Sequence, residues 1–264
     1  MADCFIKRGL DRLYRHGWLT WSQVAGPFDC KRSSLPIYRL VMGCLAVFAL
    51  QVACSEPENA PPARHVAAVE YEGTIVAMGN SLTEGYGLDA QDAYPAMLES
   101  MLKEKGYSYR VVNAGISGET STAAASRIDW VLRLAPDIVI LETGANDAFR
   151  GVETRIIEQN ISNIIQTLKA QDIVVVLAGM KMVTNLGRTY TSAFERLYHR
   201  LAQDHEVIFM PFFLKDVAGA SELNLSDGIH PNARGYAVIT ENLMPYVVAA
   251  IEQHRRFKAL SAAS

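Results

Sequence analysis

Much of this chain lacks the residues on which several common kinds of site depend. All four cysteines (Cys4, Cys30, Cys44 and Cys54) lie before residue 55, so the rest can form no disulfide, thiolate metal site or cysteine nucleophile. The phosphate-binding patterns Gly-x-Gly-x-x-Gly and Gly-x-x-x-x-Gly-Lys are absent, as is the Gly-x-Ser-x-Gly turn. No group of His, Asp and Glu has the spacing of a metal site. We therefore expect neither a metal nor a cofactor.

The chain also lacks an excess of positive charge and a long apolar run. Its formal net charge is −3, and its later part contains no basic stripe, which argues against a nucleic-acid partner. A helix that spans a bilayer needs ~20 apolar residues, whereas the run from Leu40 to Ala53 has 14. Because basic residues precede this run, it is typical of the core of a signal peptide.

The first 68 residues divide by composition. Residues 1–39 form a basic prefix, residues 40–54 resemble a lipoprotein signal, and residues 55–68 are a linker rich in Pro, Glu and Ala. Small residues before Cys54 predict lipidation there, export to the periplasm and a membrane-tethered protein of the cell envelope. The prefix is unusually long for such a signal. Either translation starts further along, which we favour, or the prefix is a cytoplasmic tail on a short anchor.

Residues 69–264 alternate between strand-like and helix-like segments. Short runs rich in β-branched residues occur at 74–78, 110–113, 137–141, 173–177 and 207–210. Helical patterns occur at 93–105, 122–134, 154–170, 191–203 and 234–254. Continuous apolar runs are typical of parallel strands that are buried on both faces. Repeated βα units predict one three-layer α/β/α sandwich with right-handed crossovers.

Two short motifs at opposite ends of this domain carry complementary chemistry. Gly79-Asn80-Ser81-Leu82-Thr83 directly follows the first predicted strand, and Asp227-Gly-Ile-His230 lies close to the C-terminus. A serine hydroxyl becomes a good nucleophile when a base takes its proton, and that base needs a carboxylate to hold its tautomer. Asp and His three residues apart in a turn can supply the base and its carboxylate. The sequence therefore predicts a serine hydrolase.

Two further segments offer groups that could stabilise an oxyanion. Gly118 lies in the segment that follows the second predicted strand, and Asn146 lies just after the third. Glycine lets a backbone N–H approach a substrate closely, and asparagine offers a side-chain amide. Parallel α/β sheets bind their ligands at the carboxyl ends of the strands, where all these residues are predicted to lie.

These four segments, in this order, resemble the sequence blocks of the SGNH or GDSL-type hydrolases, and most closely those of the bacterial arylesterase, acyl thioesterase and lysophospholipase group. The resemblance covers residues 73–251 and implies a flavodoxin-like sheet of five parallel strands. It implies Ser81 as nucleophile, His230 as base and Asp227 as its orienting carboxylate. The oxyanion hole would consist of the N–H groups of Ser81 and Gly118 and the Asn146 amide.

Two details of the resemblance concern the substrate and the nucleophile loop. Residues 182–198 resemble the substrate-side loop and next helix of that group, which implies that Leu186 and Tyr190 contact the substrate and that some Met and aromatic residues of 180–198 line an acyl pocket. The first block of the family usually reads Gly-Asp-Ser-Leu, but here Asn80 replaces the aspartate. Asp and Asn both hydrogen-bond nearby backbone N–H groups in turns, so we expect the loop to persist with one negative charge fewer.

The expected function is hydrolysis of carboxylic esters through an acyl-enzyme on Ser81, with aryl, acyl, thioester or lysophospholipid substrates. The alternatives are a carbohydrate O-acetylesterase of the cell envelope and, less favoured, a non-catalytic envelope-binding module. The expected partner is a small-molecule or lipid ester, with membrane contact only through the N-terminus. Oligomeric state is left open.

Overall fold

The computed structural model describes residues 70–182 and 186–263. The chain divides into two units, residues 1–66 and 67–264, and everything described here belongs to the second. The predicted basic prefix, signal-like segment, Cys54 lipidation site and linker lie outside the described residues. Among the described helices, none combines the length and the apolar character that crossing a membrane would require.

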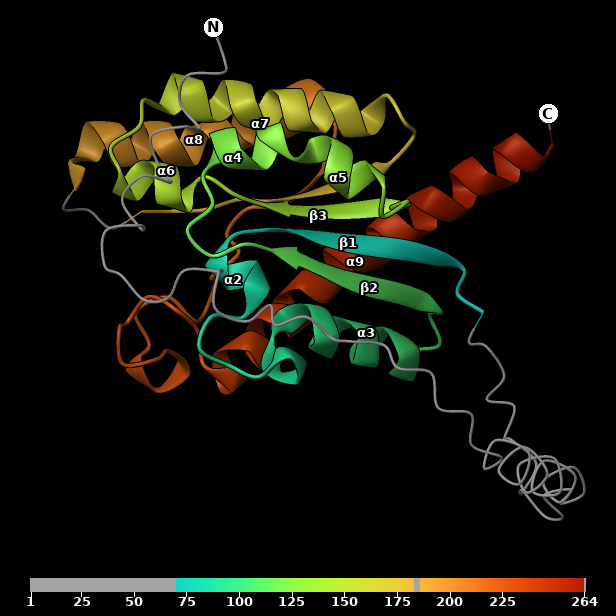
Figure 1. Ribbon diagram of the computed structural model, residues 1–264, viewed down its shortest axis with the longest axis horizontal. Helices are drawn as coiled ribbons and strands as arrows, with labels where there is room; N and C mark the ends of the chain where they lie inside the picture. Colours follow the sequence, from blue (N-terminus) through green and yellow to red (C-terminus); the bar gives the residue numbers. More distant parts are fainter. Residues whose placement is uncertain (1–69, 183–185, 264) are drawn as a thin grey trace, which may run out of the picture. The chain divides into compact units, whose positions relative to one another are not determined.

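The centre of the described unit is a sheet of five parallel strands in the order β2-β1-β3-β4-β5 (Figure 1). The strands are β1 (Gly73–Gly79), β2 (Tyr109–Gly115), β3 (Ile138–Glu142), β4 (Val174–Ala178) and β5 (Ile208–Met210). Every residue of β3 and β4 is buried, as expected for strands covered on both faces. The predicted five-stranded parallel α/β sheet is confirmed.

Helices cover both faces of this sheet and complete the three layers (Figure 1). The helix α3 (Tyr94–Glu104) and the long α9 (Ala233–Ala262) pack together on one face, and α9 contacts β3, β4 and β5. The other face carries α4 (Ser121–Ser126), α5 (Ile128–Leu132), α7 (Thr154–Lys169) and α8 (Arg188–His205). Short helices α2 (Ser81–Glu84), α6 (Ala145–Phe149), η1 (Ala90–Asp92) and η3 (Ser221–Leu223) lie in the connections.

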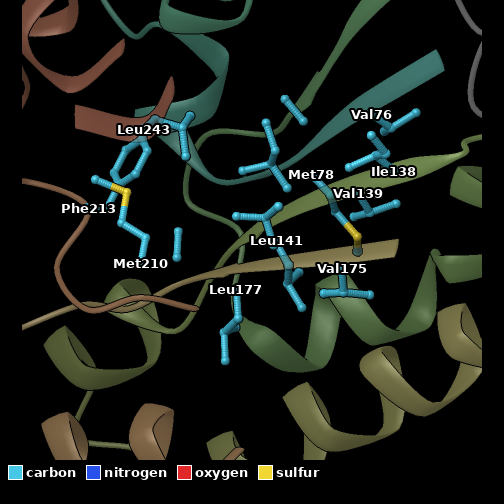
Figure 2. Packing of buried hydrophobic residues seen from close by; sticks show 14 of the residues in the cluster. Val76, Met78, Ile138, Val139, Leu141, Val175, Leu177, Met210, Phe213 and Leu243 are labelled. Atoms are coloured by element: carbon cyan, nitrogen blue, oxygen red, sulfur yellow. The ribbon is translucent and has the colours of Figure 1, made fainter. Parts of the chain in front are cut away.

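Apolar side chains at helical spacing bind these layers to the sheet. In α7 the buried residues are Ile157, Ile161, Ile164, Ile165 and Leu168, which form one stripe. Figure 2 shows the core between the layers, where strand residues such as Val139, Leu141 and Leu177 pack closely. Phe213 and Leu243 extend this cluster beyond the strands. Burial of this size holds the strand ends in fixed positions, and the strand ends carry the site.

One predicted helix is divided in the observed structure. The predicted helix at 122–134 is interrupted at Arg127, whose backbone angles (φ −107°, ψ 12°) are not helical. The Arg127 guanidinium donates to the Ala114 carbonyl and to the Glu119 carboxylate, at 2.8 and 2.7 Å. These contacts hold the residue outside the helical conformation, and the segment therefore forms two short helices, α4 and α5.

The parallel register places the carboxyl ends of the central strands side by side. Gly79 at the end of β1 pairs with Gly115 at the end of β2, and Glu142 at the end of β3 pairs with Ala178 at the end of β4. The segments that follow these strands therefore emerge at the same edge of the sheet. Residues far apart in the sequence meet there.

Candidate active site

Ser81 is placed by the sharp change from β1 to α2. Asn80 caps α2, because its side-chain oxygen accepts the Leu82 N–H at 2.9 Å. Ser81 is the first residue of this helix and is partly buried. The turn requires a glycine before it, since a Cβ at Gly79 would lie 2.7 Å from the Glu142 carboxylate and closer still to Thr83 Oγ1. The nucleophile loop, residues 79–83, is therefore tightly packed.

His230 lies directly beside Ser81 and is held by Asp227. The Nε2 atom of His230 is 2.9 Å from Ser81 Oγ, and its Nδ1 atom is 2.7 Å from Asp227 Oδ2. The other Asp227 oxygen accepts the backbone N–H groups of Ile229 and His230, at 2.8 and 3.0 Å. Tyr86 covers the imidazole, with ring centroids 4.6 Å apart. The three predicted residues thus form a continuous Ser–His–Asp hydrogen-bonded chain.

The electrostatics of Asp227 suit a permanent negative charge. Hydrogen bonds from the backbone N–H and the side chain of His230, and from the backbone of Ile229, lower the pKa of Asp227 to about 2. The carboxylate is partly exposed to solvent, so its charged form does not carry the free-energy cost of complete desolvation. It can therefore stay ionised and hold the Nδ1 side of the imidazole at neutral pH.

Donors for an oxyanion are present where the sequence predicted them. Among the described residues, the backbone N–H groups of Ser81 and Gly118 have no acceptor. Asn146 donates one Nδ2 hydrogen to the Glu119 carbonyl at 3.0 Å, which leaves the other hydrogen free. This bond links Asn146 to the residue that follows Gly118. Asn146 lines the pocket at Ser81, whereas Gly118 is exposed on the neighbouring loop.

Buried and charged groups hold the loop that carries Gly118. The Ile116 N–H donates to the Gly79 carbonyl at 2.9 Å, and Ser117 bonds to the Glu84 carboxylate of α2. The buried Asp147 accepts both the N–H and the hydroxyl of Ser121, each at 2.7 Å. Contacts to α2 and to α6 thus tie the loop to both neighbouring parts of the site.

A small, mainly apolar pocket opens beside Ser81 and His230. Its volume is about 200 Å³. The residues that line it, besides Ser81, Asn146 and His230, are Asn80, Leu82, Ala145, Phe149, Met180, Lys181, Met182, Leu214 and Ile229. Phe149 and Ile229 are about half exposed, at 51% and 49%, so the mouth of the pocket is apolar as well. Such a lining suits the hydrocarbon part of a substrate.

Comparison with known proteins agrees with this geometry. A sequence model of the GDSL-like lipase/acylhydrolase family matches residues 77–238, more than half of the chain.

The chain belongs to this family.

Two curated relatives are similar over most of their own length. Esterase TesA of Pseudomonas aeruginosa is 35% identical over 173 residues, which cover 65% of this chain and 86% of that protein. Thioesterase 1/protease 1/lysophospholipase L1 of Escherichia coli K12 is 36% identical over 160 residues, covering 60% and 76%. The crystal structure of AlinE4, an SGNH-hydrolase family esterase, superposes with a TM-score of 0.58 at 38% identity, covering 69% and 97%. The resemblance read from the four motifs is confirmed.

In this GDSL-like hydrolase, two residues predicted to contact the substrate lie outside the pocket at Ser81. Leu186 and Tyr190 do not line the pocket at Ser81 but line a separate hollow with Gly151 and residues 153–155. The Tyr190 hydroxyl donates to the Val152 carbonyl at 2.6 Å, which ties its ring to that hollow. Tyr190 lies in the first turn of α8, which begins at Arg188, and Leu186 lies in the segment just before this helix.

Several pocket residues were not singled out by the sequence. Met180 and Met182 lie in the segment expected to line an acyl pocket, but its aromatic residues do not reach the pocket. Phe149 comes from the connection after β3, and Leu214 and Ile229 come from the connection after β5. No motif marks them as a group.

Proposed function

We propose that this chain is a serine esterase that hydrolyses carboxylic esters through an acyl-enzyme on Ser81. The observation that carries the proposal is the chain of contacts from Ser81 Oγ to His230 Nε2 (2.9 Å) and from His230 Nδ1 to Asp227 (2.7 Å). This geometry is within reach for direct proton transfer. The relatives named as esterases and thioesterases support the same reaction class.

In the proposed mechanism, His230 Nε2 removes the Ser81 proton while Oγ attacks the ester carbonyl carbon. The carbonyl oxygen becomes an oxyanion that accepts hydrogen bonds from the Ser81 N–H, the Gly118 N–H and the free Nδ2 hydrogen of Asn146. Asp227 stabilises the imidazolium that forms. As the tetrahedral intermediate collapses, His230 returns the proton to the leaving alcohol, and an acyl-enzyme remains. Water then attacks the acyl group with the same base, and Ser81 is regenerated.

The pocket supports a preference for esters with a short apolar acyl group. Its volume of about 200 Å³ lies below the range of about 300–1,000 Å³ that is usual for sites of drug-sized ligands. Its lining is mainly aliphatic, aromatic and thioether side chains. The lining also contains the charged side chain of Lys181, whose ammonium is paired with Glu195 at 2.8 Å. This composition favours acyl esters over acetylated carbohydrate, which needs more polar contacts.

The test is hydrolysis of a series of p-nitrophenyl esters, from acetate to laurate, by the full chain. We expect kcat/KM to be highest for the short members and to be abolished in Ser81→Ala. A serine-reactive fluorophosphonate should label the native chain and leave Ser81→Ala unlabelled. Labelling without turnover of any member would argue against these esters and point to acetylated carbohydrate. Neither labelling nor turnover in a folded chain would favour a binding module.

We also propose that the enzyme is attached to the cell envelope through a lipid on Cys54. The support is the sequence alone: an apolar segment of signal-peptide length, small residues before Cys54, and a linker after it. A tether of this kind would leave the catalytic unit as the part that meets the substrate.

A further inference from the structure

A buried carboxylate lies directly behind Ser81, and the ester mechanism does not use it. Glu142 is the last residue of β3, and its side chain is completely buried. Glutamate is almost never fully buried unless its charge is compensated. Within the part of the chain that the structure describes, no Lys, Arg or His forms an ion pair with it. Its compensation must come from hydrogen bonds.

Three donors supply that compensation, and all of them belong to the nucleophile loop. Asn80 Nδ2 donates to Glu142 Oε1 at 2.7 Å, and the Asn80 backbone N–H donates to Oε2 at 3.2 Å. Thr83 Oγ1 donates to the same Oε2 at 3.1 Å. Both carboxylate oxygens are therefore acceptors, and the donors come from residues on either side of Ser81. The absence of a side chain at Gly79 is what permits this close approach.

The same contacts connect the two halves of the site. The Asn80 side chain holds Glu142 through its amide nitrogen and caps α2 through its oxygen, which accepts the Leu82 N–H at 2.9 Å. Beyond Glu142, the chain leads within four residues to the oxyanion donor Asn146. A displacement of Glu142 would therefore change the position of Ser81 relative to Asn146.

We propose that Glu142 is a positioning residue for Ser81, and that Asn80 and Glu142 act as one amide–carboxylate pair that fixes the nucleophile loop against the end of β3. This inference rests on the proposed ester hydrolysis at Ser81. Neither residue touches the reacting atoms, so the effect operates through the geometry of the loop. Misplacement of a reacting group by ~1 Å can lower a rate by about 10²-fold.

The identity of residue 80 follows from this pairing. An aspartate there, the usual residue of the family, would place two carboxyl groups at hydrogen-bonding distance in a buried site. Two carboxylates in one site cannot both ionise, so one must bind a proton. The Asn80 amide supplies fixed hydrogens instead, and the contact then needs no shared proton. In this chain the pair can hold the loop without depending on the protonation of a second acid.

The surroundings of Glu142 contain no competing cation among the described residues. Its neighbours with titratable groups are Tyr94 on α3, Tyr198 on α8 and Tyr236 on α9, together with Glu119. Burial, and the negative charge of Glu142, raise the pKa of all three tyrosines, so these are neutral phenols. Burial also raises the pKa of Glu142 to about 7, although its three donors act in the opposite direction.

Three variants of the pair test the proposal. In Glu142→Gln, the amide must present its NH₂ either to Asn80 Nδ2 or to the Asn80 N–H, so two donors face each other. In Asn80→Asp, two carboxyl groups face each other. In the double variant, the introduced glutamine can donate to the introduced carboxylate and accept the residue-80 N–H and Thr83 Oγ1. The double variant thus keeps every hydrogen bond. The one between the side chains of residues 80 and 142 is reversed in direction, so that residue 142 becomes its donor.

We expect each single variant to lower kcat for p-nitrophenyl esters by about tenfold to a hundredfold, with a small effect on KM. For Asn80→Asp, the ratio of its kcat to the wild-type kcat should fall as pH rises, because the shared proton is lost. The double variant should recover most of the activity. Should Glu142→Gln fail to fold, Thr83→Val, which removes a single donor, should give a smaller loss of kcat.

Asp137→Asn is the matched control, since Asp137 lies at the other end of β3 and accepts the Thr74 N–H of β1 at 2.7 Å. It should lower stability without changing kcat. Wild-type kcat in Glu142→Gln, an equal loss in Asp137→Asn, or no recovery in the double variant would each overturn the proposal.

If the wild type hydrolyses no ester, the proposed function fails separately. Thermal unfolding of the wild type, the two single variants and the double variant then tests the pair, because only the double variant should regain stability.

Discussion

At the scale of single residues, the proposed base and its proposed orienting carboxylate form a local structure. Asp227 and His230 are three residues apart, and one Asp227 oxygen binds two backbone N–H groups of the turn while the other binds the imidazole. A motif this short could be recognised from the sequence, because it needs no distant residue to form. The partner Ser81 is 149 residues away from His230 and meets it only because the sheet brings the two loops together.

The first prediction at this scale concerns the role of Asp227. Asp227→Asn keeps the size of the side chain but can donate to Nδ1, which would favour the wrong imidazole tautomer. We expect kcat to fall by about 10³- to 10⁴-fold, as when the triad carboxylate of a serine protease is changed to its amide. KM should change little, and steady-state kinetics with the best p-nitrophenyl ester would measure both. A loss confined to KM would remove Asp227 from the triad.

The second prediction concerns acid stability. The pKa of Asp227 is lowered from its ordinary value of 3.8 to about 2 in the folded state. Its contribution to stability is therefore fully present above pH about 4 and is lost as pH falls through about 2. The difference in free energy of unfolding between wild type and Asp227→Asn should narrow over that range. Because the carboxylate is partly exposed, the difference should be small. Urea unfolding at a series of acidic pH values measures it, and a difference that widens on acidification would contradict the assignment.

Other residues of the site could not be predicted from local sequence. Leu186 and Tyr190 were expected at the substrate and lie outside the pocket at Ser81, whereas Phe149, Leu214 and Ile229, from two connections, line it. Whether an apolar side chain faces a pocket or another hollow depends on how each connection leaves its strand. That direction is set by tertiary contacts such as the bond from Tyr190 to Val152.

At the scale of elements, the strands were easier to predict than the helices. Each strand appears as a short run of apolar residues and ends within a few residues of its predicted boundary. The short helices α2 and α6 were missed, because four or five residues cannot show a helical period. Their formation depends on caps and on contacts with the rest of the site. The division between α4 and α5 likewise follows from an ion pair, which local periodicity does not reveal.

That ion pair gives the third prediction. Arg127 and Glu119 are both nearly buried, with side-chain exposures of 13% and 3%. Removing one member of a buried pair leaves an uncompensated charge, which costs about 3–5 kcal/mol. Arg127→Ala should therefore lower the free energy of unfolding by about 3 kcal/mol, as measured by urea denaturation.

Arg133→Ala is the matched control for this pair, because Arg133 is exposed and close in sequence. Its unfolding free energy should stay within about 0.5 kcal/mol of wild type. Adding Glu119→Gln to Arg127→Ala should restore part of the loss, since the buried charge is then removed. Equal destabilisation by Arg127→Ala and Arg133→Ala would show that the Arg127–Glu119 pair contributes no more to the free energy of unfolding than an exposed arginine does.

At the scale of the whole molecule, the α/β alternation was sufficient to predict the layered fold, because parallel strands need crossover helices and buried faces on both sides. The sequence order of the strands differs from their order in the sheet, which is β2-β1-β3-β4-β5. This order places β1 and β3 next to each other at the centre. Their ends carry Ser81 and Asn146, so the proposed nucleophile and a proposed oxyanion donor are neighbours by topology.

The fourth prediction concerns the attachment of the whole chain to a membrane. If Cys54 is the lipidated residue, Cys54→Ala in the full chain should move esterase activity from the membrane to the soluble fraction of a Gram-negative host. It should also abolish incorporation of labelled palmitate. Cys44→Ala is the matched control, because Cys44 lies in the same apolar segment but ahead of the expected cleavage site, so both readouts should remain as in the wild type. Membrane retention unchanged in Cys54→Ala would contradict lipidation at this residue, and it would instead favour the apolar segment itself as the anchor.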